Sequence, residues 1–301
     1  MNKWKIGVVI AGAALLALGV GLFIFGLSLG ASPVVAIGRN QNGVSSKRNM
    51  ISGTVDIKEF DNIKVNVASI DVEFEKGDGY RIEYSTYEDN VPVVDQKGSK
   101  LTVSQPDNNN IYILSLDFSL KNDDRQVYKI IVPDDKTRYE IEMKATSGGV
   151  SIKDLDVKGE VGITSGDIDL QNVSSEDLAL LATSGDINIE GSKIDKFDFK
   201  ITSGSCNIKD CSFKDYKVKM SSGEIKIDDL TCDNAYFKLT SGDIKAVFAG
   251  NEEDYAYDID MTSGDVRIAG SKFEGDYKKN NNTGKEIKIE MTSGSADIDF
   301  K

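Results

Sequence analysis

Apolar and polar residues alternate in short runs along most of the chain from Ile51 onward. In the run "IDLQ", for example, Ile168 and Leu170 flank the polar Asp169. A period of two residues is typical of a β-strand that buries one face. None of these runs has the period of an amphipathic helix, so the pattern predicts an all-β domain.

The alternation belongs to an internal repeat built on Thr-Ser-Gly. The motif occurs seven times, and once more as Ser-Ser-Gly, and its successive glycines differ in number by 18, 19, 19, 19, 19, 22 and 30. These glycines are Gly148, Gly166, Gly185, Gly204, Gly223, Gly242, Gly264 and Gly294. With the motif Thr as position 1, apolar residues recur at positions 5 and 7 and again at 15, 17 and 19. Each repeat is therefore predicted to contain two short strands and two turns.

Neither strand of a repeat can bury its apolar face alone, so the repeats must stack. Stacking places equivalent positions one strand spacing apart, about 4.8 Å. We predict a parallel β-solenoid of 19-residue coils over residues 146–301, right-handed by the general preference of parallel crossovers. The longer steps are expected to add loop residues, such as Lys278–Gly284.

The motif itself is expected to form a corner of each coil. Glycine at position 3 suits a backbone that needs a positive φ. The Ser and Thr hydroxyls are expected to satisfy backbone groups that the turn leaves unpaired, as a ladder from coil to coil. On this interpretation the eight glycines are structural residues of the turn.

Residues 51–145 also contain strand-like runs, and Val67–Phe74 ("VASIDVEF") resembles a degenerate coil. We expect this region to form earlier, less regular coils or a β cap, because an open end of a solenoid exposes unpaired strand edges. Residues 31–50 have no such pattern and are predicted to be a polar linker.

The N-terminus predicts a membrane anchor. Residues 6–30 form an uncharged, mostly apolar run behind a short tail, residues 1–5. The run is long enough to span the ~30 Å hydrocarbon core as a helix, whereas a secretory apolar region is usually about 7–15 residues. We therefore expect an uncleaved transmembrane helix, with cleavage near Ala31 or Ala36 as the alternative.

The charges that flank this run give opposing indications of its orientation. Lys3 and Lys5 favour a cytoplasmic tail, whereas Arg39 and the pair Lys47–Arg48 favour the reverse. The remainder resembles an exported domain, so we expect a single-pass protein of the cell membrane with an extracellular C-terminal domain.

Composition excludes several classes of function. The net charge is -13, so no basic excess is available to bind nucleic acid. The chain contains no histidine, which removes Ser-His-Asp, Cys-His and His-metal chemistry. Cys206, Cys211 and Cys232 have no CxxC spacing and are expected in the core. A disulfide between the last two is the alternative.

Two sets of charged residues could bind a ligand. Lys200, Lys219 and Lys238 occupy position 18 of consecutive coils, with Lys217 beside them. This row could bind a polyanion such as teichoic acid or an acidic polysaccharide, and the competing interpretation is a solvated face. Leu181 and Asp260 are expected to end the row.

Acidic residues recur at positions 4 and 9 and could bind calcium. The acidic or amide residues at position 9 are Asp154, Asn172, Asp210 and Asp229. Calcium takes about six to eight oxygens, usually several from one loop, and the known calcium-binding repeat G-G-x-G-x-D-x-U-x is missing. We therefore interpret these residues as turn formers and predict neither a metal site nor a cofactor.

The serial "TSGDI-x-I" segments, with "YKIIVP" (Tyr128–Pro133) leading into "ATSGGVSI", resemble the putative bacterial adhesin family. The resemblance covers roughly Ile51–Lys301. It implies a β-solenoid at the cell surface, often with an N-terminal anchor, and brings no catalytic residues.

Taken together, the sequence predicts a non-catalytic, membrane-anchored surface protein of the bacterial envelope with a structural or adhesive role. Its expected partners are the membrane, through residues 6–30, and a cell-wall polymer or an envelope protein. A regulatory accessory protein in envelope-stress signalling is an alternative, and a polysaccharide-active β-helix enzyme is a further one.

Overall fold

The computed structural model describes residues 34–39, 49–106, 111–117, 125–134, 138–273, 275–281 and 283–301. β1 (Val34–Arg39) and β8 (Ile111–Asp117) pair antiparallel and belong to one compact unit. β1 lies inside the predicted linker, where the apolar run from Val34 to Ile37 supplies strand-forming residues. No helix of the described residues is long and apolar enough to cross a membrane, and the predicted span, residues 6–30, lies outside them.

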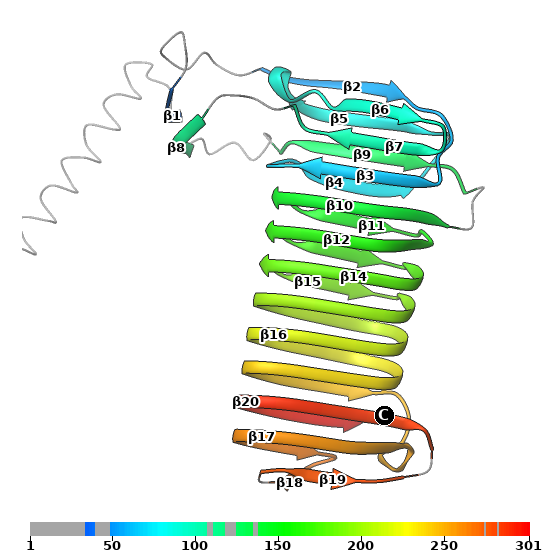
Figure 1. Cartoon of the computed structure of the whole chain (residues 1–301), viewed down its shortest axis with the longest axis vertical. Coiled ribbons are helices and arrows are strands. Elements are labelled where there is room, and N and C mark those ends of the chain that lie inside the picture. The colour runs from blue at the N-terminus through cyan, green and yellow to red at the C-terminus, as the bar shows by residue number, and fades with distance from the viewer. Residues whose placement is uncertain are drawn as a thin grey trace, which may run out of the picture. The chain divides into compact units, whose positions relative to one another are not determined.

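The second unit, Asn49–Pro106 with Arg125–Lys301, is the predicted β-solenoid (Figure 1). Its regular part contains β10 (Tyr139–Ser147), β11 (Val150–Lys153), β12 (Val157–Ser165), β13 (Ile168–Gln171), β14 (Ser174–Ser184), β15 (Ile187–Glu190) and β16 (Lys193–Phe248). One set of strands, β10, β12, β14 and part of β16, pairs in parallel, each in register with the strand one repeat further along the chain. A second set, β11, β13, β15 and another part of β16, pairs in the same way. We call the first set the long-strand sheet and the second the short-strand sheet.

The core between the two sheets consists of the apolar positions of the repeat. Ile168, Ile187 and Ile225, which share position 5, are each 0% exposed. Ile168 is in register with Ile187, and Ile187 with Cys206. The stacking of residues nineteen apart is thereby confirmed for the regular coils.

The N-terminal region is both a set of coils and a cap. It contains β2 (Met50–Asp56), β3 (Asn62–Val67), β4 (Asp71–Lys76), β5 (Arg81–Tyr87), the 3-10 turn η1 (Glu88–Asn90), β6 (Val93–Lys97), β7 (Lys100–Ser104) and β9 (Val127–Val132). β3 and β4 stack in parallel on β10 and β11, and β7 and β9 stack on them in turn. The antiparallel strands β5, β2 and β6 then cover the sheet edges.

The C-terminal region departs from the predicted order of coils. It contains the 3-10 turn η2 (Glu252–Asp254), β17 (Tyr255–Ile268), β18 (Ser271–Phe273), β19 (Tyr277–Lys279) and β20 (Lys285–Phe300). β20 pairs in parallel with β16 on one side and with β17 on the other, so the last coil in the sequence lies between the two preceding ones (Figure 1). The expectation that the coil of Gly264 stacks directly on that of Gly242 is therefore wrong.

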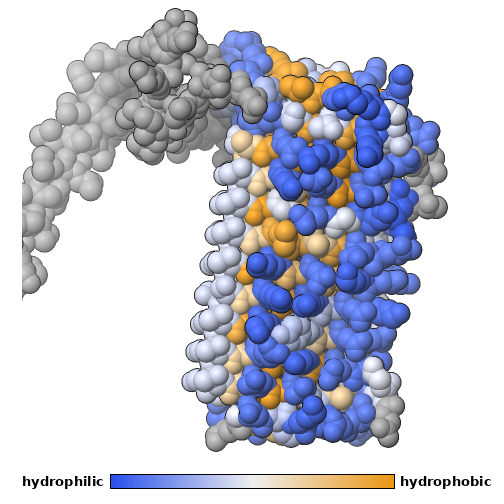
Figure 2. All heavy atoms as spheres, viewed as in Figure 1, coloured by the Kyte–Doolittle hydropathy of each residue, from blue (hydrophilic) through white to orange (hydrophobic). Residues whose placement is uncertain are grey.

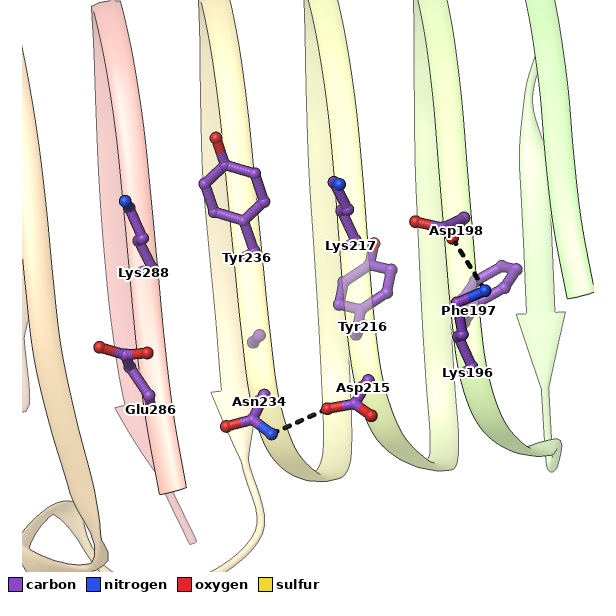
Figure 3. A pocket seen from close by; sticks show the side chains of 11 residues that line it. Lys196, Phe197, Asp198, Asp215, Tyr216, Lys217, Asn234, Tyr236, Glu286 and Lys288 are labelled. Carbon is purple, nitrogen blue, oxygen red and sulfur yellow. Dashed lines mark hydrogen bonds and ion pairs between the residues drawn. The ribbon is translucent and has the colours of Figure 1, made fainter. Parts of the chain in front are cut away.

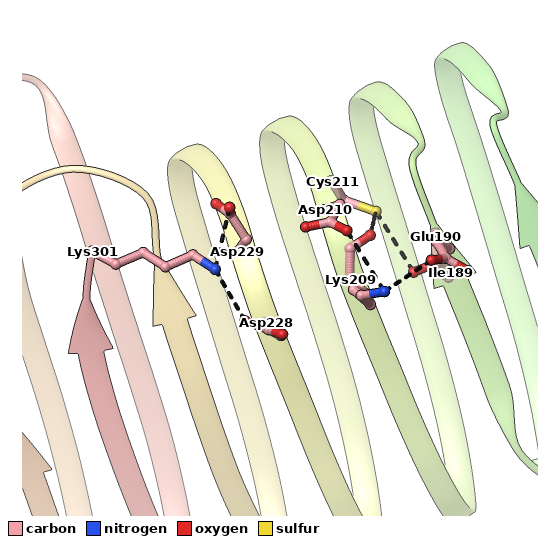
Figure 4. A network of polar contacts seen from close by, with 8 residues as sticks. All are labelled: Ile189, Glu190, Lys209, Asp210, Cys211, Asp228, Asp229 and Lys301. Atoms are coloured by element: carbon pink, nitrogen blue, oxygen red, sulfur yellow. Dashed lines mark hydrogen bonds and ion pairs between the residues drawn. The ribbon is translucent and has the colours of Figure 1, made fainter.

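Several contacts hold β20 in this place. The Phe300 ring lies 6.2 Å from the Phe248 ring and 5.4 Å from the Tyr255 ring. The Lys301 ammonium reaches Asp228 at 3.2 Å and Asp229 at 3.3 Å (Figure 4). β18 and β19 pair antiparallel with the outer edges of β17, which closes this end of both sheets.

Candidate functional site

The three lysines at position 18 project outward from the long-strand sheet. Lys200 is in register with Leu181 on one side of the stack, and Lys238 is in register with Glu290 of β20 on the other. Lys200, Lys219 and Lys238 are all exposed, and we call them the lysine column. Leu181 ends the column as predicted. Its other end is Glu290 rather than Asp260, because β20 lies between β16 and β17.

Glu290 neutralises one end of the lysine column. Its carboxylate lies 2.8 Å from the Lys238 ammonium and 3.0 Å from the Lys288 ammonium. Contacts with Lys238, with the Tyr236 hydroxyl and with Lys288 lower the pKa of Glu290 to about 2. Lys200, Lys217 and Lys219 have no ion pair with any described residue. These three lysines therefore form a group on this sheet whose ammonium charges are not paired with described carboxylates.

A shallow hollow lies beside the column on the same sheet (Figure 3). Tyr236 lies between two cations, with the Lys217 ammonium 5.9 Å and the Lys288 ammonium 5.6 Å from the centre of its ring. At the far side of the hollow, Lys196 is paired with Asp177 at 2.9 Å and with Asp198 at 3.7 Å. Asp198, Asp215 and Glu286 also line the hollow, so charges of both signs meet there beside the lysine column.

The motif glycines form a continuous ladder at one corner of the coils. All eight have φ between 128° and 144°, a region that side chains other than glycine essentially do not adopt. A Cβ atom on Gly185 would lie 1.8 Å from the carbonyl oxygen of Gly166. Both the positive φ and the close approach of neighbouring coils therefore require glycine at position 3.

The hydroxyls of the motif do not have the expected role. Within the described residues, none of the Thr and Ser side chains at positions 1 and 2 makes a hydrogen bond to another protein group. Three position-4 carboxylates, those of Asp167, Asp186 and Asp243, accept a backbone N–H of the neighbouring corner instead. Asp167 accepts from the backbone N–H of Asp186 at 2.9 Å, and Asp186 accepts from that of Ser205 at 3.2 Å. A carboxylate one residue after the glycine competes with the motif hydroxyls for this backbone N–H, and it is favoured because a charged acceptor gives the stronger hydrogen bond.

The residues at position 9 mark a second corner. Asp154, Asn172, Asp210 and Asp229 have φ between 52° and 64°, and Gly191 has φ 61°. Asp, Asn and Gly are the residues that favour this left-handed conformation. Among the residues that the structure describes, no group of three or more acidic or thiol side chains could hold a metal ion. The backbone conformation therefore accounts for these residues.

The three cysteines lie in the core, as predicted, and are free thiols. Burial raises the pKa of Cys206 and of Cys232 to about 12 and that of Cys211 to about 11. All three thiols are therefore protonated at neutral pH and unsuited to nucleophilic chemistry.

Sequence reasoning missed the residues that β20 brings to this surface. Lys288 and Glu290 lie next to Tyr236 and Lys238 only because β20 occupies the place that the repeat assigns to β17. The one available signal was the lengthening of the last two steps, from Gly242 to Gly264 and from Gly264 to Gly294.

Comparison with known proteins identifies the type of domain. The family model described as Toastrack DUF4097 matches residues 60–299. No curated protein matches the chain.

Several solved structures resemble the chain. They include a putative cell adhesion protein from Clostridium sporogenes ATCC 15579, with 14% identity, covering 85% of this chain and 100% of that one at a TM-score of 0.26. A putative adhesin from Bacteroides fragilis NCTC 9343 has 15% identity, covering 86% and 100% at a TM-score of 0.33. A putative lipid binding protein from Parabacteroides distasonis ATCC 8503 has 15% identity, covering 84% and 97% at a TM-score of 0.29. Similarity at this level says nothing about function.

Proposed function

Since the chain belongs to the Toastrack DUF4097 family, we propose that it is a non-catalytic binding protein of the bacterial envelope that holds an anionic polymer on its long-strand sheet. The observation that carries this proposal is the group of Lys200, Lys217 and Lys219, which are exposed and without an ion pair among the described residues. These three unpaired positive charges lie close together on a chain whose net charge is -13.

The regular spacing of the lysines supports this role. The lysine column belongs to consecutive coils, so its charges repeat at about 4.8 Å along the stack. A polymer with regularly spaced anions can contact several of them at once, and weak contacts then add through multivalency. An exposed ion pair contributes only about 0.2–1 kcal/mol, so no single lysine is expected to dominate.

The proposal is tested with the combined substitution Lys200→Gln, Lys217→Gln and Lys219→Gln. We expect about a tenfold loss of affinity for polyphosphate and for polygalacturonate, together with a weaker dependence on salt. The matched control is Lys209→Gln, Lys226→Gln and Lys245→Gln, which removes the same charge from the short-strand sheet. Lys209 and Lys226 are already paired with Glu190 and Glu224. Equal losses in both variants would contradict a specific site.

We also propose that residues 6–30 anchor the protein in the membrane with the solenoid outside the cell. This rests on the apolar run and on Lys3 and Lys5 before it. In cell fractionation, the full chain should stay with the membranes after a high-salt wash, and a chain without residues 1–30 should not. Protease added to intact cells should degrade the solenoid only if it is outside.

A further inference from the structure

The Thr-Ser pairs of the repeat form a hydroxyl ridge along the glycine corner. The position-1 residues are Thr146, Thr164, Thr183, Thr202, Ser221, Thr240, Thr292 and Thr262, in the order of the stack. Each is followed by the serine of position 2. Figure 2 shows an unbroken column of near-neutral hydropathy along the edge at which β10, β12 and β14 end.

The fold does not explain why these positions carry hydroxyls. All sixteen side chains are exposed. Within the part of the chain that the structure describes, none of them hydrogen-bonds to another protein group. The corner needs the glycine, for its φ of 128° to 144°, and in some coils a position-4 carboxylate adds a hydrogen bond, as in Asp186 accepting from Ser205. The hydroxyls are thus free to bind something outside the chain.

The ridge runs beside the lysine column. Lys200 precedes Thr202, Lys219 precedes Ser221 and Lys238 precedes Thr240, each by two residues on one strand. Residues two apart on a strand face the same side and lie about 6.6–6.8 Å apart. Three consecutive coils therefore each place a lysine and a hydroxyl side by side, repeated every ~4.8 Å along the stack, and in two of them, those of Lys200 and Lys219, the lysine has no ion pair with a described residue.

We propose that the hydroxyl ridge and the lysine column together bind a linear anionic polysaccharide that lies along the stack. A Ser or Thr hydroxyl can either donate a hydrogen bond to a sugar hydroxyl or accept one from it. A lysine ammonium only donates, so it suits the carboxylate of an acidic sugar. A repeated array matches a polymer rather than a small molecule. This inference rests on the proposed polyanion-binding function and adds that the ligand is a sugar polymer.

The test removes hydroxyls beside the lysines with Thr202→Val, Ser221→Ala and Thr240→Val combined. Valine suits an exposed strand position as well as threonine does, so folding should be retained, and thermal unfolding checks this. We expect about tenfold weaker binding of polygalacturonate, since three hydrogen bonds of modest net strength are lost. Binding of polyphosphate, an anion without sugar hydroxyls, should stay within twofold of the unchanged protein.

The matched control is Thr54→Val with Thr231→Val, two exposed threonines away from the ridge, and it should leave both affinities unchanged. If the ridge variant binds polygalacturonate as tightly as the unchanged protein, or loses both polymers equally, the ridge proposal is overturned. The proposed function would survive that result, because it depends on the lysine variants. If the lysine variants lose neither polymer, the proposed function fails, and the ridge proposal fails with it.

Discussion

Two regions of the solenoid, residues 146–248 and residues 249–301, are built from the same motif but stacked differently. In the first, the order of coils in space is the order in the sequence, because the motif recurs at a nearly constant step. In the second, β20 lies between β16 and β17, although it follows both in the chain. Identical corner chemistry therefore does not determine the order of the coils.

The difference follows from the length of chain between motifs. The regular step of 19 residues completes one coil, and the next coil then begins one strand spacing further along the stack. The step from Gly242 to Gly264 is longer than the step from Gly223 to Gly242 by three residues. At about 3.3–3.6 Å for each residue, this additional chain can span another spacing of about 4.8 Å. The chain can then leave a space one coil high, which β20 fills after the hairpin strands β18 and β19.

This arrangement affects the candidate binding surface. If β17 had stacked directly on β16, Asp260 would lie beside Lys238. The insertion of β20 places Glu290 there instead and adds Lys288 next to Tyr236. The non-sequential coil thus decides where the lysine column ends.

The largest expected effect comes from the glycine ladder, which both regions share. Gly185→Ala in the regular coils and Gly294→Ala in β20 would each place a Cβ atom 1.8 Å from a carbonyl oxygen at a positive φ. We expect each to lower the free energy of unfolding by about 3–5 kcal/mol, measured by chemical denaturation. Gly162→Ala is the control, because its Cβ would meet only the Met143 oxygen at 3.7 Å, and it should be neutral or stabilise by up to about 1 kcal/mol. A much smaller cost at Gly294 would mean that β20 is loosely held.

An intermediate effect is expected from the position-4 carboxylates. Asp186 accepts from the backbone N–H of Ser205 at 3.2 Å in sequential coils, and Asp243 accepts from that of Ser295 at 3.0 Å across the inserted one. Asp186→Ala and Asp243→Ala should each destabilise by about 1–2 kcal/mol, since an N–H loses a charged acceptor. Asp195→Ala, an exposed residue away from the corner, should change little. An effect confined to Asp186 would show that Ser295 is not in the place described.

The smallest expected effect is the pH dependence contributed by Glu290. Its pKa is lowered to about 2 in the folded chain, against about 4.3 when unfolded. A lowered pKa stabilises the fold above pH ~4.3, and this contribution is lost as the pH falls toward 2. At pH 5 the unchanged protein should exceed Glu290→Gln in free energy of unfolding by about 1 kcal/mol or less. This difference should shrink as the pH falls from 5 to 2. Glu286→Gln, which removes a charge from the same strand, controls for net charge, and an equal pH dependence in both variants would contradict this assignment.

The sequence predicted what the period alone determines. Ile168 and Ile187 had to point inward and stack because the alternation is strict, and only glycine suits the corner at Gly185. It did not predict the partners of polar groups. Several groups could accept a hydrogen bond from the backbone N–H of Ser205. The choice of Asp186 over a hydroxyl depends on the three-dimensional geometry of the corner, which the repeat period does not determine. Nor could the period place Glu290, because the position of β20 depends on the length of loops and on contacts such as that between Phe300 and Tyr255.

The order of the last three coils can be tested most directly by disulfide trapping. Ser241 is in register with Ser293, and Ser293 with Ser263. Adjacent parallel positions lie about 4.8 Å apart, within the Cα separation of about 4.4–6.8 Å that a disulfide needs, whereas positions two coils apart lie at about 9.6 Å. Under mild oxidation, the Ser241→Cys and Ser293→Cys pair should form an intramolecular disulfide, and the Ser241→Cys and Ser263→Cys pair should not. The opposite result would place β17 directly on β16, remove Glu290 from the end of the lysine column and contradict the account given above.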